Sequence, residues 1–333
     1  MISIWANIYL LKYYQCCKMH VESWRQDLIN KRKFNMKKIA LSALLVGLMG
    51  MAQADVGVYG KVREYEESYT LGSASAATRL TNDTSRFGVK ASENVGNGIT
   101  VSAVIETGVA MDAPSATTLG DRVAIVSLTN NLGTVSAGRD KHAVTRALDN
   151  FDALENTYGT IAGSVHAAQG SRVQNALFVT TAPIMGISAT YQLSNSENAS
   201  VSNTQAGSIN YSVGPLSATV ARYDDGISSA STIAGAKFTL AKTGTTVYGL
   251  YSDDKVSGVA STGKSIGVAQ ALSTKLTALG SYGTNDTGLK AQAVGVAYAQ
   301  NKSLTFHARY SKVDSATDTA DVTQYGVGLE YNF

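Results

Sequence analysis

The sequence has little proline, little charge and no long hydrophobic runs. Proline occurs only 3 times in 333 residues, and charged residues make up 16%, against roughly 25% in soluble domains. The mean hydropathy is −0.03, and the several apolar runs of about 20 residues that a bundle of transmembrane helices needs are missing. A disordered chain would carry more charge. The remaining class is a β-rich protein whose apolar residues alternate with polar ones.

Cysteine and tryptophan are confined to the first 35 residues, and a targeting pattern follows them. This pattern consists of Met36-Lys37-Lys38, an apolar run over 39–51, and Ala52-Gln53-Ala54. A basic start, a short apolar run and an A-x-A site are typical of a secretory signal peptide, whereas a transmembrane helix would need a longer run. We expect residues 1–35 to be an over-extended start and 36–54 a signal peptide that is cleaved after Ala54.

The charge of residues 55–333 differs from that of the whole chain. They hold 20 basic and 23 acidic residues and no cysteine. The overall pI of 8.6 therefore comes mostly from the leader and gives no argument for a nucleic-acid partner. Without cysteine, disulfides and thiolate metal sites are excluded in this part. We expect no metal and no cofactor.

Apolar and polar residues alternate with a period of two through most of residues 55–333. In 303–311, Leu304, Phe306 and Tyr310 alternate with threonine, histidine, arginine and serine, and Tyr325–Phe333 shows the same pattern. Alternation is typical of half-buried β-strands. A soluble β-sandwich would show it too, so the period alone leaves a sandwich and a barrel open.

Short turn signals and longer polar connections follow one another in strict alternation. The short turns are Asn94–Gly98, Asn130–Gly133, Ala182–Gly186, Val213–Leu216, Ala241–Gly244, Ala271–Thr274 and Ala299–Ser303. The longer connections are 69–84, 107–120, 140–170, 194–205, 224–231, 254–262, 283–288 and 311–322. This order predicts sixteen antiparallel strands with short turns at one end, as in outer-membrane barrels. A closed barrel pairs every backbone group in lipid, and one of this size surrounds an aqueous channel.

Several segments resemble the general bacterial porins, the non-specific trimeric channels of Gram-negative outer membranes. The segments are Asp55–Lys61, Ser85–Glu93 with Asn94–Thr100, Gly133–Arg139, Ser171–Asn175 and Tyr325–Phe333. They keep the family's order throughout 55–333. The chain is short for the family, and Arg63–Glu67 is more highly charged than is usual at this position.

The resemblance implies an all-β transmembrane antiparallel barrel of 16 strands with a third loop folded inward. It implies a homotrimer in the outer membrane, in contact with outer-membrane lipid and lipopolysaccharide, through which ions and small hydrophilic solutes diffuse passively. It also implies that the outer-membrane assembly machinery reads the terminal Phe333. The loss of clean alternation in Asp121–Asn130 fits a strand that another subunit covers.

The resemblance places the selective part of the channel at residues 140–170, the expected constriction loop. Its acidic residues Asp149, Asp152 and Glu155 would face a basic wall. The wall residues would be Lys61, Arg86, Arg139 and Arg172. Opposed charges across a narrow, water-filled opening orient polar solutes and tune ion preference, although scattered solvated charges remain the alternative. We expect His307 and Arg309 to line the lumen away from the loop.

Motifs of catalysis are missing from the sequence. No P-loop, HExxH or GxSxG occurs, and Gly326-Val-Gly328 lacks the third glycine and the helix of a dinucleotide site. A barrel hydrolase would need a histidine beside Ser or Asp, and residues 55–333 contain only His142, His166 and His307. We therefore expect no enzyme. A surface-binding or plugged β protein is the other class considered, and the modest loop lengths argue against it.

Overall fold

The computed structural model describes residues 54–333, apart from 113–117, 156, 168–171, 199–200 and 317–319. The expected over-extended start and the signal peptide before Ala54 lie outside the described residues. Asp55–Phe333 form one compact unit. None of the described helices is long and apolar enough to cross a membrane.

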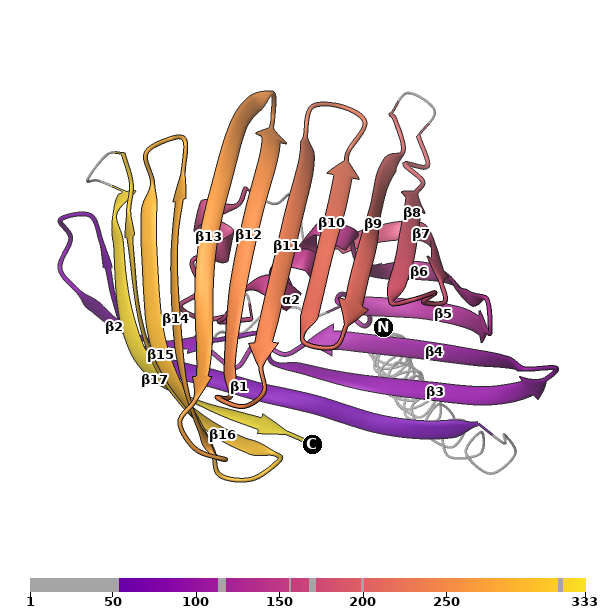
Figure 1. Cartoon of the computed structure of the whole chain (residues 1–333), viewed down its shortest axis with the longest axis horizontal. Helices are drawn as coiled ribbons and strands as arrows, with labels where there is room; N and C mark the ends of the chain where they lie inside the picture. Colours follow the sequence, from indigo (N-terminus) through magenta and orange to yellow (C-terminus); the bar gives the residue numbers. More distant parts are fainter. Residues whose placement is uncertain (1–53, 113–117, 156, 168–171, 199–200, 317–319) are drawn as a thin grey trace, which may run out of the picture. The chain divides into compact units, whose positions relative to one another are not determined.

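Antiparallel strands make up most of this unit (Figure 1). They are β1 (Asp55–Leu71), β2 (Ala77–Asn82), β3 (Arg86–Gly96), β4 (Ile99–Gly108), β5 (Val123–Asn130), β6 (Gly133–Lys141), β7 (Arg172–Thr181), β8 (Ile187–Ser194), β9 (Thr204–Val213), β10 (Leu216–Asp224), β11 (Ala230–Leu240), β12 (Thr245–Val256), β13 (Val259–Ala271), β14 (Leu276–Asn285), β15 (Lys290–Ala299), β16 (Leu304–Asp314) and β17 (Val322–Asn332). Two short helices, α2 (Ala143–Phe151) and α3 (Ala162–Val165), lie between β6 and β7.

The strands close into an antiparallel barrel of 16 strands, which confirms the expected fold. β1 closes the ring by pairing with β17 over Lys61–Leu71. β2 and β3 form one barrel strand, because both pair with the same edge of β1, one ending at Asn82 and the other starting at Arg86. Thr84 between them has a φ of 61°, so the strand is interrupted locally.

The alternation of the sequence separates the two faces of the wall. On β10, Val220 is 55% exposed, whereas its neighbours Thr219 and Ala221 are buried inside the barrel. On β13, Ile266 points outward and Ser265 inward. In a membrane, the outward row faces lipid and the inward row faces the lumen.

Some connections at the long-loop end are shorter than the sequence predicts. The expected loop 69–84 is mostly strand, with only 72–76 joining β1 to β2. The expected loop 254–262 is wrong as well, because Ser257 and Gly258 alone join β12 to β13. Their φ angles of 48° and 87° are typical of a type I′ hairpin turn. The strict alternation of short and long connections therefore fails here, although the strand count holds.

Candidate pore constriction

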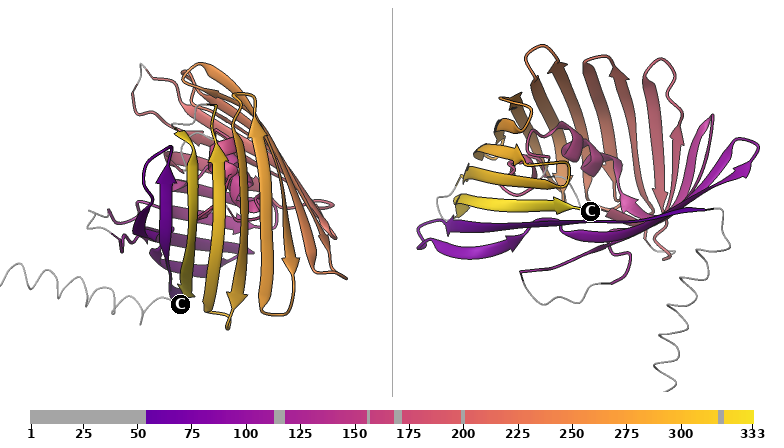
Figure 2. Two further views of the ribbon diagram at one scale, coloured as in Figure 1. Left: turned by 90° about the vertical axis from the view of Figure 1, so that its left-hand side faces the viewer. Right: turned by 90° about the horizontal axis from the view of Figure 1, so that it is seen from below.

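The connection between β6 and β7, called the third loop below, folds into the barrel. Figure 2 (right) shows α2 inside the ring of strands. The His142 side chain caps α2 by accepting a hydrogen bond from the Thr145 backbone N–H at 3.3 Å. The apolar face of α2 then packs on β9–β12, in a cluster of Val144, Leu148, Phe151, Ile233 and Leu250. Burial of this face holds the first half of the loop against one arc of the wall.

The second half of the loop is fixed by His166. Its Nδ1 lies 2.8 Å from Ser252 Oγ on β12, and its Nε2 lies 2.9 Å from Ser265 Oγ on β13. Burial lowers the pKa of His166 to about 4, which the nearby Asp254 opposes only in part. The ring is therefore neutral at pH 7, with one nitrogen donating and the other accepting.

A third attachment lies between these two. Arg309 on β16 donates from Nη1 to Thr157 Oγ1 and to the Tyr158 carbonyl oxygen, both at 2.6 Å. Asp83 accepts the Tyr158 backbone N–H at 3.0 Å, and the Tyr65 and Tyr158 rings stack at 4.1 Å. Arg309 thus holds the loop, and the expectation that it lies away from the loop is wrong.

The three loop acids lie in different surroundings. Asp149 forms an ion pair with Lys141. Asp152 is only 6% exposed and accepts a hydrogen bond from Thr160 Oγ1 at 2.6 Å. Glu155 is exposed and has a φ of 58°. Of the three acids, two are engaged within the loop and its base, which leaves Glu155 as the most exposed carboxylate.

Two of the expected wall residues lie side by side in the lumen row. Lys61 on β1 and Arg86 on β3 are register partners. Lys61 Nζ lies 3.2 Å from Glu330 Oε1, and Arg86 Nε lies 3.4 Å from Glu106 Oε2. Each cation therefore has a carboxylate on a neighbouring part of the wall rather than on the loop.

Two charges that were not expected from the sequence, Glu106 and Arg122, also belong to this wall. Arg122, just before β5, places Nε 2.8 Å from Glu106 Oε1, so that Arg86 and Arg122 share one carboxylate. The expected wall residue Arg172 lies within electrostatic reach of Arg122, Glu106 and Asp140. Alternation of Glu106 with apolar Ile105 could have revealed the acid. It could not have revealed Arg122, which follows the irregular 109–121 connection. We call Lys61, Arg86, Arg122 and Arg172 the basic wall.

Arg139 occupies a different place from the one expected. On β6 it continues the outward row of Val135 and Ala137, and its register partner on β5 is Ala124. Ala124 pairs with Ile105, which is 45% exposed on the outer surface. Arg139 Nη1 donates to the exposed Gln174 at 2.9 Å. Register therefore places Arg139 on the outward face, which corrects its assignment to the constriction.

The last residue closes the barrel seam. The backbone N–H of Gly60 donates to the Phe333 carbonyl oxygen at 3.0 Å, and the Phe333 N–H donates back to Gly60 at 3.1 Å. A Cβ on Gly60 would lie 2.2 Å from the Phe333 ring, so the ring covers this glycine. Among the described residues, no group of three or more His, Cys, Asp or Glu could hold a metal ion.

The profile of one protein family, described as Gram-negative porin, matches residues 40–333. The chain belongs to the Gram-negative porin family. It is therefore a multi-pass β-barrel of the outer membrane and a channel through which solutes diffuse. No curated protein sequence matches it.

Solved porin structures share the fold of this porin at low sequence identity. The anion-selective porin from Comamonas acidovorans is 18% identical, with a TM-score of 0.73, covering 84% of this chain and 100% of that chain. The OmpF of Salmonella typhi in complex with daunomycin is 16% identical, with a TM-score of 0.69, covering 84% and 97%. A triple mutant of the Rhodopseudomonas blastica porin is 18% identical, with a TM-score of 0.67, covering 84% and 100%.

Proposed function

We propose that this porin is a homotrimeric channel for passive diffusion of ions and small hydrophilic solutes, and that its constriction lies between the third loop and the basic wall. Both helices of the loop pack on the arc from β9 to β15, and of the described loop residues only Tyr158 reaches Tyr65 on β1 and Asp83. Lys61, Arg86, Arg122 and Arg172 come from the complementary arc from β1 to β7. This division of the wall supports the proposal, because it leaves the passage bordered by the loop on one side and by cations on the other.

We further propose that the constriction prefers anions. The observation that carries this is an imbalance: Arg86 and Arg122 share the single carboxylate of Glu106, whereas Asp149 has its own cation in Lys141. Fixed charge at the narrowest point acts on ions within about 8 Å at physiological salt. The Comamonas porin, similar in fold, is named for anion selectivity.

The test is the zero-current potential across a salt gradient in a planar bilayer. Arg86→Gln combined with Arg122→Gln should shift the potential toward cation preference. Arg222→Gln is the matched control, because this arginine lies on the outward row of β10 and is 61% exposed as a side chain. A double variant with the wild-type potential, in trimers of normal yield, would show that the basic wall does not border the path.

The histidines support a channel rather than a hydrolase. His166 lies beside two serines, which is the arrangement that a nucleophilic enzyme would need. Both His166 and Ser252 are at most 1% exposed, so no substrate reaches them. His142 caps a helix, and His307 lies 3.7 Å from Glu330 in the wall. We propose that the protein has no catalytic activity.

We further propose that Phe333 serves as the signal that the outer-membrane assembly machinery reads.

A further inference from the structure

Charged residues are sorted by sign between the two ends of the barrel. The only charged residues in the short turns are the exposed lysines Lys242, Lys275 and Lys302. The described acids in the long connections between barrel strands, the third loop aside, are Asp112, Asp121, Glu197, Asp225, Asp286 and Asp321. The one described cation of these connections is Arg122, which lies against Glu106 in the basic wall. The short-turn end is therefore positive and the long-loop end negative.

The lumen next to the short turns has the same sign as the turns. Lys90 lies on the inward row of β3, beyond the basic wall toward the short turns. Lys237 lies on the inward row of β11 and donates to a backbone carbonyl oxygen of α2 at 3.3 Å. Neither lysine has an ion-pair partner among the described residues. Apart from the paired Glu330, the acids at this end are Asp55 at the rim and the terminal carboxylate of Phe333, so cations predominate.

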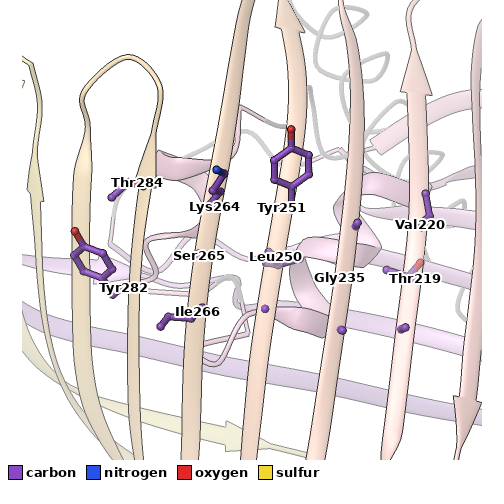
Figure 3. A pocket seen from close by; sticks show the side chains of 14 residues that line it. Thr219, Val220, Gly235, Leu250, Tyr251, Lys264, Ser265, Ile266, Tyr282 and Thr284 are labelled. Atoms are coloured by element: carbon purple, nitrogen blue, oxygen red, sulfur yellow. The ribbon is translucent and has the colours of Figure 1, made fainter.

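Cations on the strands near the long-loop end do little to cancel its acids. Two of them are already paired, namely Arg222 with Asp224 at 3.2 Å and Lys312 with Asp314 at 2.6 Å. Lys255, Lys264 and Lys290 lie on the outward rows of their strands. Figure 3 shows Lys264 on the outer face of the barrel, together with Tyr251 and Tyr282. The wall therefore separates these three lysines from the water of the channel.

Fixed charge at the mouth of a channel changes the supply of ions to the channel. Lysines enrich anions at the short-turn mouth, and acids enrich cations at the long-loop mouth. With the long-loop side positive, anions enter past the lysines and cations enter past the acids, so both fill the lumen. With the opposite voltage, each kind of ion enters through the mouth that repels it, and the lumen is depleted. Equal and opposite voltages should therefore drive different currents.

We propose that the channel rectifies, and that at equal voltages it carries more current when the long-loop side is positive. The mouth charges act over about 30 Å at 0.01 M salt but over only about 8 Å at physiological salt. The asymmetry therefore belongs to dilute surroundings, and at physiological salt the constriction sets the ion preference. The sign is the same for anions and cations. The inference thus rests on the proposed function for a water-filled channel and not for its anion preference.

The test compares the currents at equal positive and negative voltages in a planar bilayer with 0.01 M salt on both sides. Residues 55–333 hold no cysteine, so Ser228→Cys in the exposed connection from β10 to β11 can be biotinylated selectively. Streptavidin, added to one side at a time, then identifies the long-loop side. The current with that side positive should exceed the reverse current. The two currents should become equal at 1 M salt, where the Debye length is about 3 Å.

Removal of the turn lysines should lower the ratio of the two currents toward one. The variant combines Lys242→Gln, Lys275→Gln and Lys302→Gln. The matched control removes the same charge from the outer face and should not lower the ratio; it combines Lys255→Gln, Lys264→Gln and Lys290→Gln.

Removal of acids from the opposite mouth should lower the ratio as well. The variant is Glu197→Gln with Asp225→Asn. Asp225 Oδ1 accepts three backbone N–H groups of its own loop, at 2.8 to 2.9 Å. Asparagine keeps a carbonyl oxygen for these bonds, so the loop keeps its shape and only the charge is lost.

Each other outcome has a definite meaning. Equal currents at 0.01 M salt, or a larger current with the long-loop side negative, would overturn the rectification. A ratio that the turn lysines and the outward lysines lower equally would overturn the assignment to the mouths. A wild-type zero-current potential in Arg86→Gln with Arg122→Gln would refute the proposed constriction and leave the rectification intact. Absent conductance in wild type would refute the channel itself, and the rectification with it.

Discussion

At the scale of single residues, aromatic rings lie over glycines at several places in this barrel. A Cβ on the glycine would come within 3 Å of the ring in each case. The pairs are Gly60 with Phe333, Gly88 with Tyr59, Gly235 with Phe151, and Gly328 with Tyr65. Three of these pairs join β1 to a neighbouring segment, namely β3 on one edge and β17 or Phe333 on the other, so these glycines allow the strands to approach closely where the barrel closes.

Replacing Gly60 by alanine should destabilise the barrel. The new methyl group overlaps the Phe333 ring, which must turn away at a cost of about 1–3 kcal/mol. The measurement is the thermal midpoint of refolded protein in detergent. Gly163→Ala is the control, because a Cβ there meets nothing within 4 Å. In a Phe333→Ala background the cost of Gly60→Ala should largely vanish; an undiminished cost would mean that the ring is not its cause.

At the scale of elements, the third loop is held at three separate places. α2 is held by apolar packing, Thr157 and Tyr158 by Arg309, and the end of the described loop by His166. The apolar packing of α2 does not titrate, and the arginine keeps its charge at any ordinary pH. The His166 ring changes its charge in a pH range that the outer membrane can meet.

Acid should therefore loosen the end of the loop. Because the folded pKa of His166, about 4, lies below its ordinary value of 6.5, the docked state binds the proton less readily than the released state. Docking is strongest above pH 6.5, weakens as pH falls from 6.5 to 4, and levels off below. Over this pH range the free energy that favours the docked loop end falls by about 3 kcal/mol.

Hydrogen exchange of the amides in 162–167, corrected for the intrinsic pH dependence, measures this loosening. Wild type should lose protection between pH 6.5 and 4, whereas His166→Gln, which keeps a donor and an acceptor but does not titrate, should lose much less. A parallel loss in both proteins would assign the effect to another group.

The strands also show which parts of the candidate site the sequence predicts. Unbroken alternation on β1 and β3 predicts that Lys61 and Arg86 share a face, and the structure pairs them. Arg139 is misplaced by motif, because the same alternation continued from Val135 puts it outward. Arg122 follows an irregular connection, and Ser257-Gly258 is a tight turn among polar residues. The position of Arg122 and the length of this turn depend on contacts between strands, which local sequence does not reveal.

At the scale of the whole molecule, the sign of the ion selectivity should depend on the difference between the charges of the basic wall and those of the third loop, and not on the net charge of the protein. Residues 55–333 hold more acids than bases, yet Arg86 and Arg122 on the basic wall share one carboxylate. Outward charges such as Arg222 lie behind the wall and away from the path. Only side chains at the constriction should therefore move the zero-current potential.

Asp149→Asn combined with Glu155→Gln should make the channel more anion-selective. The first change leaves Lys141 without its carboxylate, and the second removes the most exposed acid of the loop. The zero-current potential should shift opposite to that of Arg86→Gln with Arg122→Gln, and both shifts should shrink in high salt because the Debye length falls to about 3 Å at 1 M. Asp286→Asn, an exposed acid in the connection from β14 to β15, is the matched control and should leave the potential unchanged. If the loop variant keeps the wild-type potential while the arginine variant does not, the wall alone sets the selectivity and the loop serves only to narrow the passage.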